Sequence, residues 1–341
     1  MLSNLGVSVP VLAAPMAGGP STPELVIATA KAGGLGFLAG GYKTPAALGE
    51  QIAAVREHGV PFGVNLFAPN PVPVDPAAFR EYAKALQPEA EAYGLDLTTA
   101  APREDDDVWD EKISMLLADP VPLVSFTFGL PSAQVLTGLR RVGTVVAQTV
   151  TTAREALLAT ERGVDLLIVQ STEAGAHSGT LTPHQPPPSV PLKDLIAQVR
   201  GVTSVPIVAT GGLATPEAIA NVIKAGAVAA AVGTVLLRSD EAGTSPIHRE
   251  ALANPPGDGS TVITRAFTGR PARGLRNRFT DQFDGVAPLG YPALHHLTSP
   301  LRSAAAKAGD AELVHLWAGT GYRHATDEPA GDILRHLTTG L

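Results

Sequence analysis

Residues 205–234 read VPIVATGGLATPEAIANVIKAGAVAAAVGT and contain two short apolar runs on either side of a segment with helical spacing. The runs at 206–210 and 229–236 are continuously apolar, which is typical of strands that are buried on both faces of a parallel sheet. Between the runs, Thr215 can cap a helix that begins at Pro216, because a threonine before a proline suits the first helical turn. The stretch predicts a strand, a helix and a second parallel strand.

The same organisation repeats along the chain. Six further apolar runs, separated by helical segments, lie at residues 11–16, 35–40, 62–67, 123–128, 144–150 and 166–170. Thr-Pro or Asp-Pro junctions that suit helix starts recur at residues 22–23, 44–45 and 75–76. A gapless alignment of residues 17–40 with 210–233 gives nine identities in 24 positions, as βα units that repeat or converge on the same turns would. Eight strands alternating with helices predict an α/β fold of the TIM (β/α)8 barrel type.

The pattern also predicts how the chain is divided. Residues 1–240 are expected to form the barrel, interrupted by an excursion at about 69–122 that holds a helix and the acidic run 104–107, an expected solvated surface. Beyond about Ser239 the strand pattern stops. Residues 241–341 are expected to be mainly helical, with helices at 246–252 and 297–316, and to pack over the active-site face of the barrel.

Composition excludes several classes of protein. Hydrophobic residues make up 45% of the 341 residues, which is enough for a large core, and the net charge of −7 disfavours nucleic acid as a partner. The absence of cysteine excludes disulfides, thiolate metal sites and a cysteine nucleophile. No apolar run reaches the ~18 residues of a membrane span, and the start of the chain lacks the basic region of a signal peptide. The expected location is the cytoplasm.

Candidate site residues follow the strand ends, where parallel barrels carry their chemistry. Gly211 and Gly212 after the seventh strand, with Gly233 and Thr234 in the eighth, are glycine-rich turns that can cradle a phosphate, or ordinary turns. The polar stretch 170–179 after the sixth strand contains His177, a candidate base or anion partner or else a hydrogen-bonded loop histidine.

Two further strand ends offer weaker candidates. Asn65 can hydrogen-bond a heteroaromatic ring or cap a turn, and Met16 can pack against a flat ring or in the core. GLGFLA at 34–39 fits the loose dinucleotide fingerprint but lies along a predicted strand, and no P-loop, HExxH or GxSxG motif is present. His295 and His296 are adjacent and diverge on a helix, so no metal site is predicted.

Several separated motifs resemble those of one known family. They are APMAGG (14–19), PFGVNLFAP (61–69), QSTEAGAHSGT (170–180), VATGG (208–212), AVGT (231–234), FTGRPARGLRNRF (267–279), YPALHHLT (291–298) and HLWAGTGY (315–322). Together they resemble the first class of nitronate monooxygenases, formerly nitropropane dioxygenases, which are FMN-dependent barrels. The resemblance runs along nearly the whole chain.

The resemblance implies a set of site residues. FMN would be bound by Asn65, Gln170, Gly175, Gly212, Ala231, Val232, Gly233 and Thr234, with Met16 and Gly211 beside the flavin or its phosphate. His177 matches the active-site histidine, and Tyr291 would line the substrate cavity. The chain departs from the family pattern at Ala176, where EAGGH has a second glycine, and at Ser299, where some members have a lysine.

The implied activity is oxidation of alkyl nitronates, including propionate 3-nitronate, by O2 to a carbonyl compound and nitrite. It would run through a flavin semiquinone without NAD(P)H and serve detoxification. His177, protonated or hydrogen-bonding, would face the nitronate charge, and would remove the α-proton of a neutral nitroalkane. The alternatives are an FMN-dependent NAD(P)H reductase of a quinone or enoyl thioester, a flavin-free phosphate-metabolite lyase or isomerase, and a non-catalytic FMN-binding protein. The oligomeric state stays open.

Overall fold

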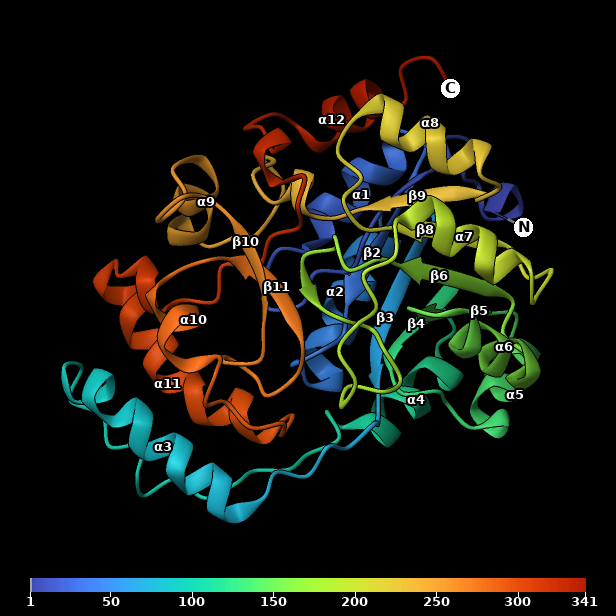
Figure 1. Ribbon diagram of the computed structural model, residues 1–341. Coiled ribbons are helices and arrows are strands. Elements are labelled where there is room, and N and C mark those ends of the chain that lie inside the picture. Colours follow the sequence, from blue (N-terminus) through green and yellow to red (C-terminus); the bar gives the residue numbers. More distant parts are fainter. Residues whose placement is uncertain (1) are drawn as a thin grey trace.

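The computed structural model describes residues 2–341, so Met1, at the start of the expected barrel unit, lies outside it. These residues form eight parallel strands closed into a barrel in the order β1-β2-β3-β4-β5-β6-β8-β9 (Figure 1). The strands are β1 (Val11–Ala13), β2 (Leu35–Ala39), β3 (Phe62–Ala68), β4 (Leu123–Phe128), β5 (Val145–Val150), β6 (Leu166–Gln170), β8 (Ile207–Thr210) and β9 (Ala229–Val232). Parallel pairing of Val11 with Ala230 closes the ring. The expected TIM barrel is confirmed.

Helices cover the outside of the barrel. They are α1 (Pro23–Lys31), α2 (Pro45–Arg56), α4 (Trp109–Ala118), α5 (Ala133–Arg141), α6 (Ala153–Arg162), α7 (Leu192–Arg200), α8 (Pro216–Lys224) and α12 (Ala330–Leu337). The expected caps are present: the Thr22 hydroxyl accepts a hydrogen bond from the Leu25 amide at 3.0 Å, and Thr215 does the same for Ala218 at 3.2 Å. Each satisfies an amide that has no partner within its helix.

The first and last barrel strands are shorter than expected. The run at 11–16 is a strand only to Ala13, and the run at 229–236 is a strand only to Val232. Gly233 leaves the extended conformation with φ −122° and ψ −69°, and Thr234–Leu236 forms a 3₁₀ turn. Beyond β9, Val235 and Leu236 are buried in the 3₁₀ turn, whereas residues 14–16 beyond β1 are half-buried.

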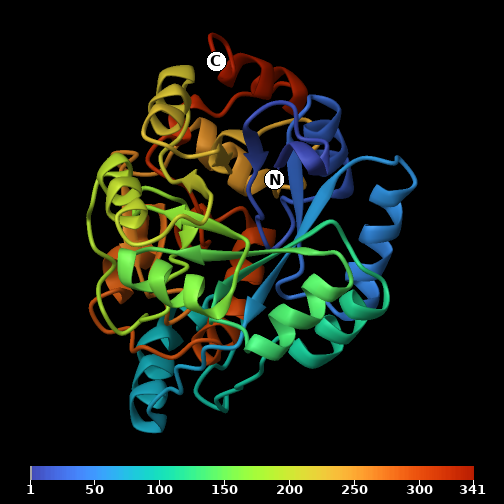
Figure 2. The same ribbon diagram turned by 90° about the vertical axis from the view of Figure 1, so that its right-hand side faces the viewer.

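The excursion contains two helices where one was expected, α3 (Pro76–Glu91) and α4. In both views α3 lies at the edge of the molecule, beside α11 (Ala293–Ala308) (Figures 1 and 2). The acidic run is not wholly the expected solvated surface. Asp107 turns inward and pairs at 2.7 Å with Lys112, whose side chain is 1% exposed, because a buried ammonium requires a counter-ion.

The expectation that the strand pattern stops beyond Ser239 is wrong. β10 (Thr261–Thr264) and β11 (Ala272–Leu275) form an antiparallel sheet with β7 (Ala176–His177), in the order β10-β11-β7. The helices of this region are α9 (Pro246–Ala253), α10 (Arg278–Phe283) and α11. The helix expected at 297–316 corresponds to α11, which begins and ends earlier than expected. It ends before Gly309, which takes a left-handed φ of +76°. Within residues 2–341, no helix is long and apolar enough to cross a membrane.

Candidate active site

A cavity of about 570 Å³ opens at the carboxyl ends of the barrel strands and extends beneath α11. All but one of the residues singled out in the sequence line it: Met16, Asn65, Gln170, Gly175, His177, Gly211, Gly212, Ala231, Val232, Gly233 and Thr234. Its size is in the range of small-molecule and cofactor sites. The strand-end rule and the resemblance therefore pointed to one place in the fold.

Tyr291 was expected to line the cavity, but it is not among the described residues that do so. Its hydroxyl donates to the Tyr42 hydroxyl at 3.2 Å, and its ring packs edge-on against Phe128 and His177 at 5.2 and 5.6 Å between centroids. Tyr42, Phe128 and His177 do line the cavity. Tyr291 thus supports the cavity wall from the far side of these residues, because its polar and aromatic contacts are already made there.

The two glycines at the end of β8 form a turn that only glycine can build. Gly211 and Gly212 have φ of +115° and +70°. A Cβ on Gly211 would collide with the Ser171 hydroxyl, and one on Gly212 would lie 2.6 Å from Glu173 Oε2. Such a backbone exposes amide groups at close range, as phosphate-binding turns do. The turn fits the phosphate of a nucleotide cofactor.

Asn65, at the C-terminal half of β3, is 3% exposed and held in one orientation. Its amide nitrogen donates to the hydroxyls of Ser125 and Thr127 on β4 at 2.9 and 3.1 Å. These bonds leave the amide oxygen as the side-chain atom available to a ligand. An acceptor fixed at the barrel mouth suits the N–H group of a heteroaromatic ring, so the donor set also fits a flavin.

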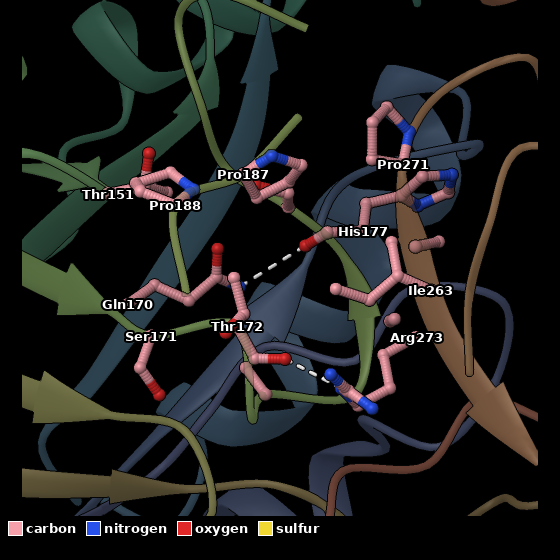
Figure 3. Close-up of a pocket in the computed structure, with 14 residues that line it drawn as sticks. Thr151, Gln170, Ser171, Thr172, His177, Pro187, Pro188, Ile263, Pro271 and Arg273 are labelled. Atoms are coloured by element: carbon pink, nitrogen blue, oxygen red, sulfur yellow. Dashed lines mark hydrogen bonds between the residues drawn. The ribbon is translucent and has the colours of Figure 1, made fainter. Parts of the chain in front are cut away.

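Gln170 fixes the loop that carries His177. Its amide nitrogen donates to the His177 carbonyl at 3.2 Å, drawn as a dashed line in Figure 3, and its oxygen accepts from the Gly179 amide at 2.7 Å. Gly175 packs the same loop against the C-terminal segment, since a Cβ there would lie 2.6 Å from the Gly319 nitrogen. Both residues therefore position His177 by bonding or packing within the protein.

His177 belongs to β7, where it pairs with Ala272 of β11. Its Nε2 lies 2.9 Å from the Thr268 hydroxyl, and that hydroxyl donates to the Arg270 carbonyl at 3.3 Å. Burial, together with the nearby charges of Arg270 and Arg302, lowers the pKa of His177 to about 3. The imidazole is neutral at pH 7, so of the two expected states of His177 the geometry favours the hydrogen-bonding one.

Ala176, the departure from the family's glycine, takes a φ of +63°. This left-handed conformation costs an alanine roughly 1–2 kcal/mol. Pairing of Ala176 with Arg273 in the β7–β11 ladder holds it there. The substitution therefore leaves the loop in the conformation that glycine would favour, at the cost of local strain beside His177.

Sequence reasoning missed most of the wall contributed by the C-terminal region. His295, Arg302, His315 and Trp317 all line the cavity, and the Trp317 ring lies 5.5 Å from that of His177. They come from α11 and from the segment after it, not from strand ends. His295 and His296 diverge as expected: the first faces the cavity, and Nε2 of the second lies 2.8 Å from Asp105 Oδ2.

Burial makes the histidines of the cavity neutral. It lowers the pKa of His248 to about 4 and that of His295 to about 2, and brings the pKa of His315 well below its ordinary value. In the part of the chain that the structure describes, no group of three or more histidine or acidic side chains is arranged to hold a metal ion. The positive charge beside the cavity is therefore carried by arginine.

Comparison with known proteins agrees with this geometry. A family model described as nitronate monooxygenase matches residues 1–340. The chain is 34% identical over 338 residues to a probable nitronate monooxygenase of Staphylococcus aureus strain Newman, covering 98% of this chain and 94% of that protein.

Solved structures extend the comparison. The nitroalkane oxidase of Streptomyces ansochromogenes matches with a TM-score of 0.91 and 45% identity, covering 98% of this chain and 96% of that one. FabK of Thermotoga maritima matches with a TM-score of 0.75 and 24% identity, covering 98% and 94%, a likeness that shows the fold alone.

Proposed function

This chain belongs to the nitronate monooxygenase family, and from that premise we propose that it binds FMN and oxidises small alkyl nitronates with O2 to a carbonyl compound and nitrite. Residues 1–240 would hold the cofactor and residues 241–341 would cover it. The observation that carries the proposal is the single cavity that joins the glycine turns, Asn65 and His177. A neutral nitroalkane is a second candidate substrate, because the neutral imidazole of His177 can accept a proton.

The donor set supports FMN in particular. The turns at Gly211, Gly212 and Gly233 suit a phosphate, and the amide oxygen of Asn65 suits a ring N–H. When bound, FMN would supply the electron acceptor that the side chains lack. The protein would contribute binding, orientation and exclusion of water, with Trp317 and Phe128 forming apolar walls beside His177.

His177 would act on a proton at one defined nitrogen. The Thr268 hydroxyl donates its proton to the Arg270 carbonyl, so its oxygen would accept a hydrogen bond from Nε2–H of His177. Nε2 would then be the protonated nitrogen of the imidazole. The lone pair at Nδ1 is left to accept the α-proton of a nitroalkane or a hydrogen bond from substrate. With an anionic nitronate no proton need be removed, so His177 would only orient it.

Spectroscopy of the purified protein tests the proposal. We expect flavin absorption bands that change on anaerobic addition of an alkyl nitronate and do not change with NADPH, followed by nitrite release once air is admitted. Reduction by NADPH with no response to nitronate would favour the reductase alternative. Absence of flavin even after incubation with FMN would favour the alternative of a flavin-free phosphate-metabolite enzyme.

Gly233→Val should weaken FMN binding by about tenfold or more without unfolding the protein. The φ of −122° at Gly233 suits valine, and the atoms nearest to a Cβ there would be Met16 Sδ at 3.6 Å and Ala14 Cβ at 3.7 Å. Both neighbours line the cavity, so the added methyl groups would occupy space offered to the cofactor. Fluorescence titration with FMN measures the change.

Gly285→Val provides the matched control, since Gly285 is exposed and has no atom within 4 Å of its Cβ position. This variant should bind FMN as the unmodified protein does. Equal FMN affinity of both variants would contradict the placement of the cofactor at the end of β9.

A further inference from the structure

Arg302 is a buried cation in the wall of the cavity. It lies on α11, is 5% exposed, and shares the cavity-facing side of the helix with Ser299 and Ser303. Its Nε donates to Thr298 Oγ1 at 3.0 Å, and its Nη2 to the His295 carbonyl at 2.9 Å.

The remaining nitrogen of Arg302 faces a second histidine. Nη1 lies 3.0 Å from Nδ1 of His315, and longer contacts of 3.3 and 3.4 Å go to other ring nitrogens of His315 and His295. Both histidines are neutral, because burial lowers their pKa values. Every partner of this guanidinium is therefore uncharged.

No carboxylate among residues 2–341 forms an ion pair with Arg302. The more exposed Arg278 shows the usual arrangement, since it pairs with Glu89 at 2.5 Å and Asp310 at 3.4 Å. Burial lowers the pKa of Arg302 to about 10, which leaves it charged at neutral pH. A buried cation without a counter-ion is unfavourable, and an anionic ligand relieves that cost.

A second buried guanidinium, that of Arg270, allows direct contact with a ligand to be distinguished from a long-range electrostatic effect. Arg270 is fully buried, has no carboxylate ion pair within the described residues, and lies over the Phe128 ring at 4.1 Å from its centroid. It does not line the cavity, whereas Phe128 does. Arg270 can therefore affect a ligand only through space, but Arg302 can touch it.

Arg302 and the glycine turns have different surroundings. The hydrogen-bond partners of Arg302 lie on α11 and the segment after it, whereas Gly212 is bordered by Glu173 and Thr320 and Gly233 by Met16 and Ala14. The turns and Arg302 thus offer two separate places for an anion. A nitronate carries its charge on two oxygens in one plane, with the shape of a carboxylate. The planar fork of a guanidinium matches that shape with two parallel hydrogen bonds.

We propose that Arg302 binds the anionic group of the substrate, a planar two-oxygen anion of the nitronate type, and thereby sets the preference for nitronates over neutral nitroalkanes. This inference rests on the proposed function for the identity of the substrate. The charge that receives the nitronate is thus a permanent one on α11, and His177 is left neutral.

Arg302→Gln tests the proposal in the FMN-loaded protein. We expect its Kd for sodium nitrite, followed by tryptophan fluorescence, and its KM for an alkyl nitronate to rise at least tenfold. The KM for the corresponding neutral nitroalkane should change less than threefold. Arg302→Lys should recover part of the loss, and Arg270→Gln should show a smaller one, because Arg270 acts without contact.

A second pair of variants retains the arginine, in case Arg302→Gln fails to fold. Ser299→Asp places a carboxylate one helical turn from Arg302 and supplies the missing counter-ion, whereas Ser299→Asn is its uncharged match. Nitrite binding should be lost with aspartate and kept with asparagine. Equal nitrite affinity in both would overturn the proposal.

The measurements also separate this inference from the proposed function. Loss of FMN from Arg302→Gln would assign the arginine to the cofactor and overturn the inference. If the unmodified protein fails to oxidise nitronates while nitrite binding still requires Arg302, the anion site stands and the proposed function falls. Unchanged nitrite Kd and nitronate KM in Arg302→Gln would overturn the inference alone.

Discussion

His177→Asn is expected to lower kcat/KM for a neutral nitroalkane by about 10²- to 10⁴-fold, the usual contribution of a positioned general base. The reason is that His177 is the neutral imidazole in the cavity that is oriented by Thr268, 2.9 Å from its Nε2. Turnover of the preformed nitronate should fall much less, because that substrate has already lost its α-proton. Parallel assays of a nitroalkane and its nitronate, by nitrite release, measure the difference.

His177→Gln sharpens the experiment, since its longer amide can reach the Nε2 position and keep the contact with Thr268 without supplying a base. It should lose nitroalkane activity as His177→Asn does, while binding FMN normally. Thr268→Ser keeps the hydroxyl and serves as the control that retains both activities. Equal retention of nitroalkane and nitronate turnover in His177→Asn would rule out the assignment of this residue as the base.

The apoprotein is expected to lose about 5 kcal/mol of unfolding free energy between pH 7.5 and 5.5. Burial holds the pKa of His177, His248, His295 and His315 below the value of about 6.5 that they regain on unfolding. Unfolding therefore takes up protons once the pH falls below about 6.5, and the stability present above that pH is lost. Because typical domains have about 5–15 kcal/mol of unfolding free energy, this loss should remove roughly a third or more of the stability.

Urea unfolding at a series of pH values measures this effect, and the slope against pH counts the protons taken up. His248→Gln should reduce the uptake by one, since it removes one of the neutral histidines while glutamine can still donate to the Trp317 carbonyl. An unfolding free energy that stays constant between pH 7.5 and 5.5 would show that these histidines take up protons in the folded protein as readily as in the unfolded one.

The barrel could be predicted because its strands carry a local signal. Runs such as 123–128 and 166–170 are mainly apolar, and the structure buries all but one residue of each run between the barrel interior and the surrounding helices. β7, β10 and β11 carry no such signal. They are two or four residues long, and β11 pairs with β7 about 95 positions earlier in the chain, so tertiary contact forms them.

The residues of the candidate site also divide into those that the sequence could predict and those that it could not. Residues at strand ends, such as Asn65 and Gly212, could be found because a barrel brings all strand ends together. Arg302 could not be found by that rule, because it lies on a helix after the last barrel strand. The sequence did contain one indication of Arg302. Leu294, Thr298 and Arg302 recur every four residues on the buried side of α11, where a charged residue departs from the apolar pattern of a buried helix face.

The pairing of β7 with β11 limits how substrate can enter and leave. The short strand that bears His177 is hydrogen-bonded to β11 of the C-terminal region, through Ala272 and Arg273. A hinged flap over the site would have to break this ladder or carry the histidine away with it. Any opening of the site that leaves His177 in place must therefore come from side-chain rotation or from segments outside this ladder.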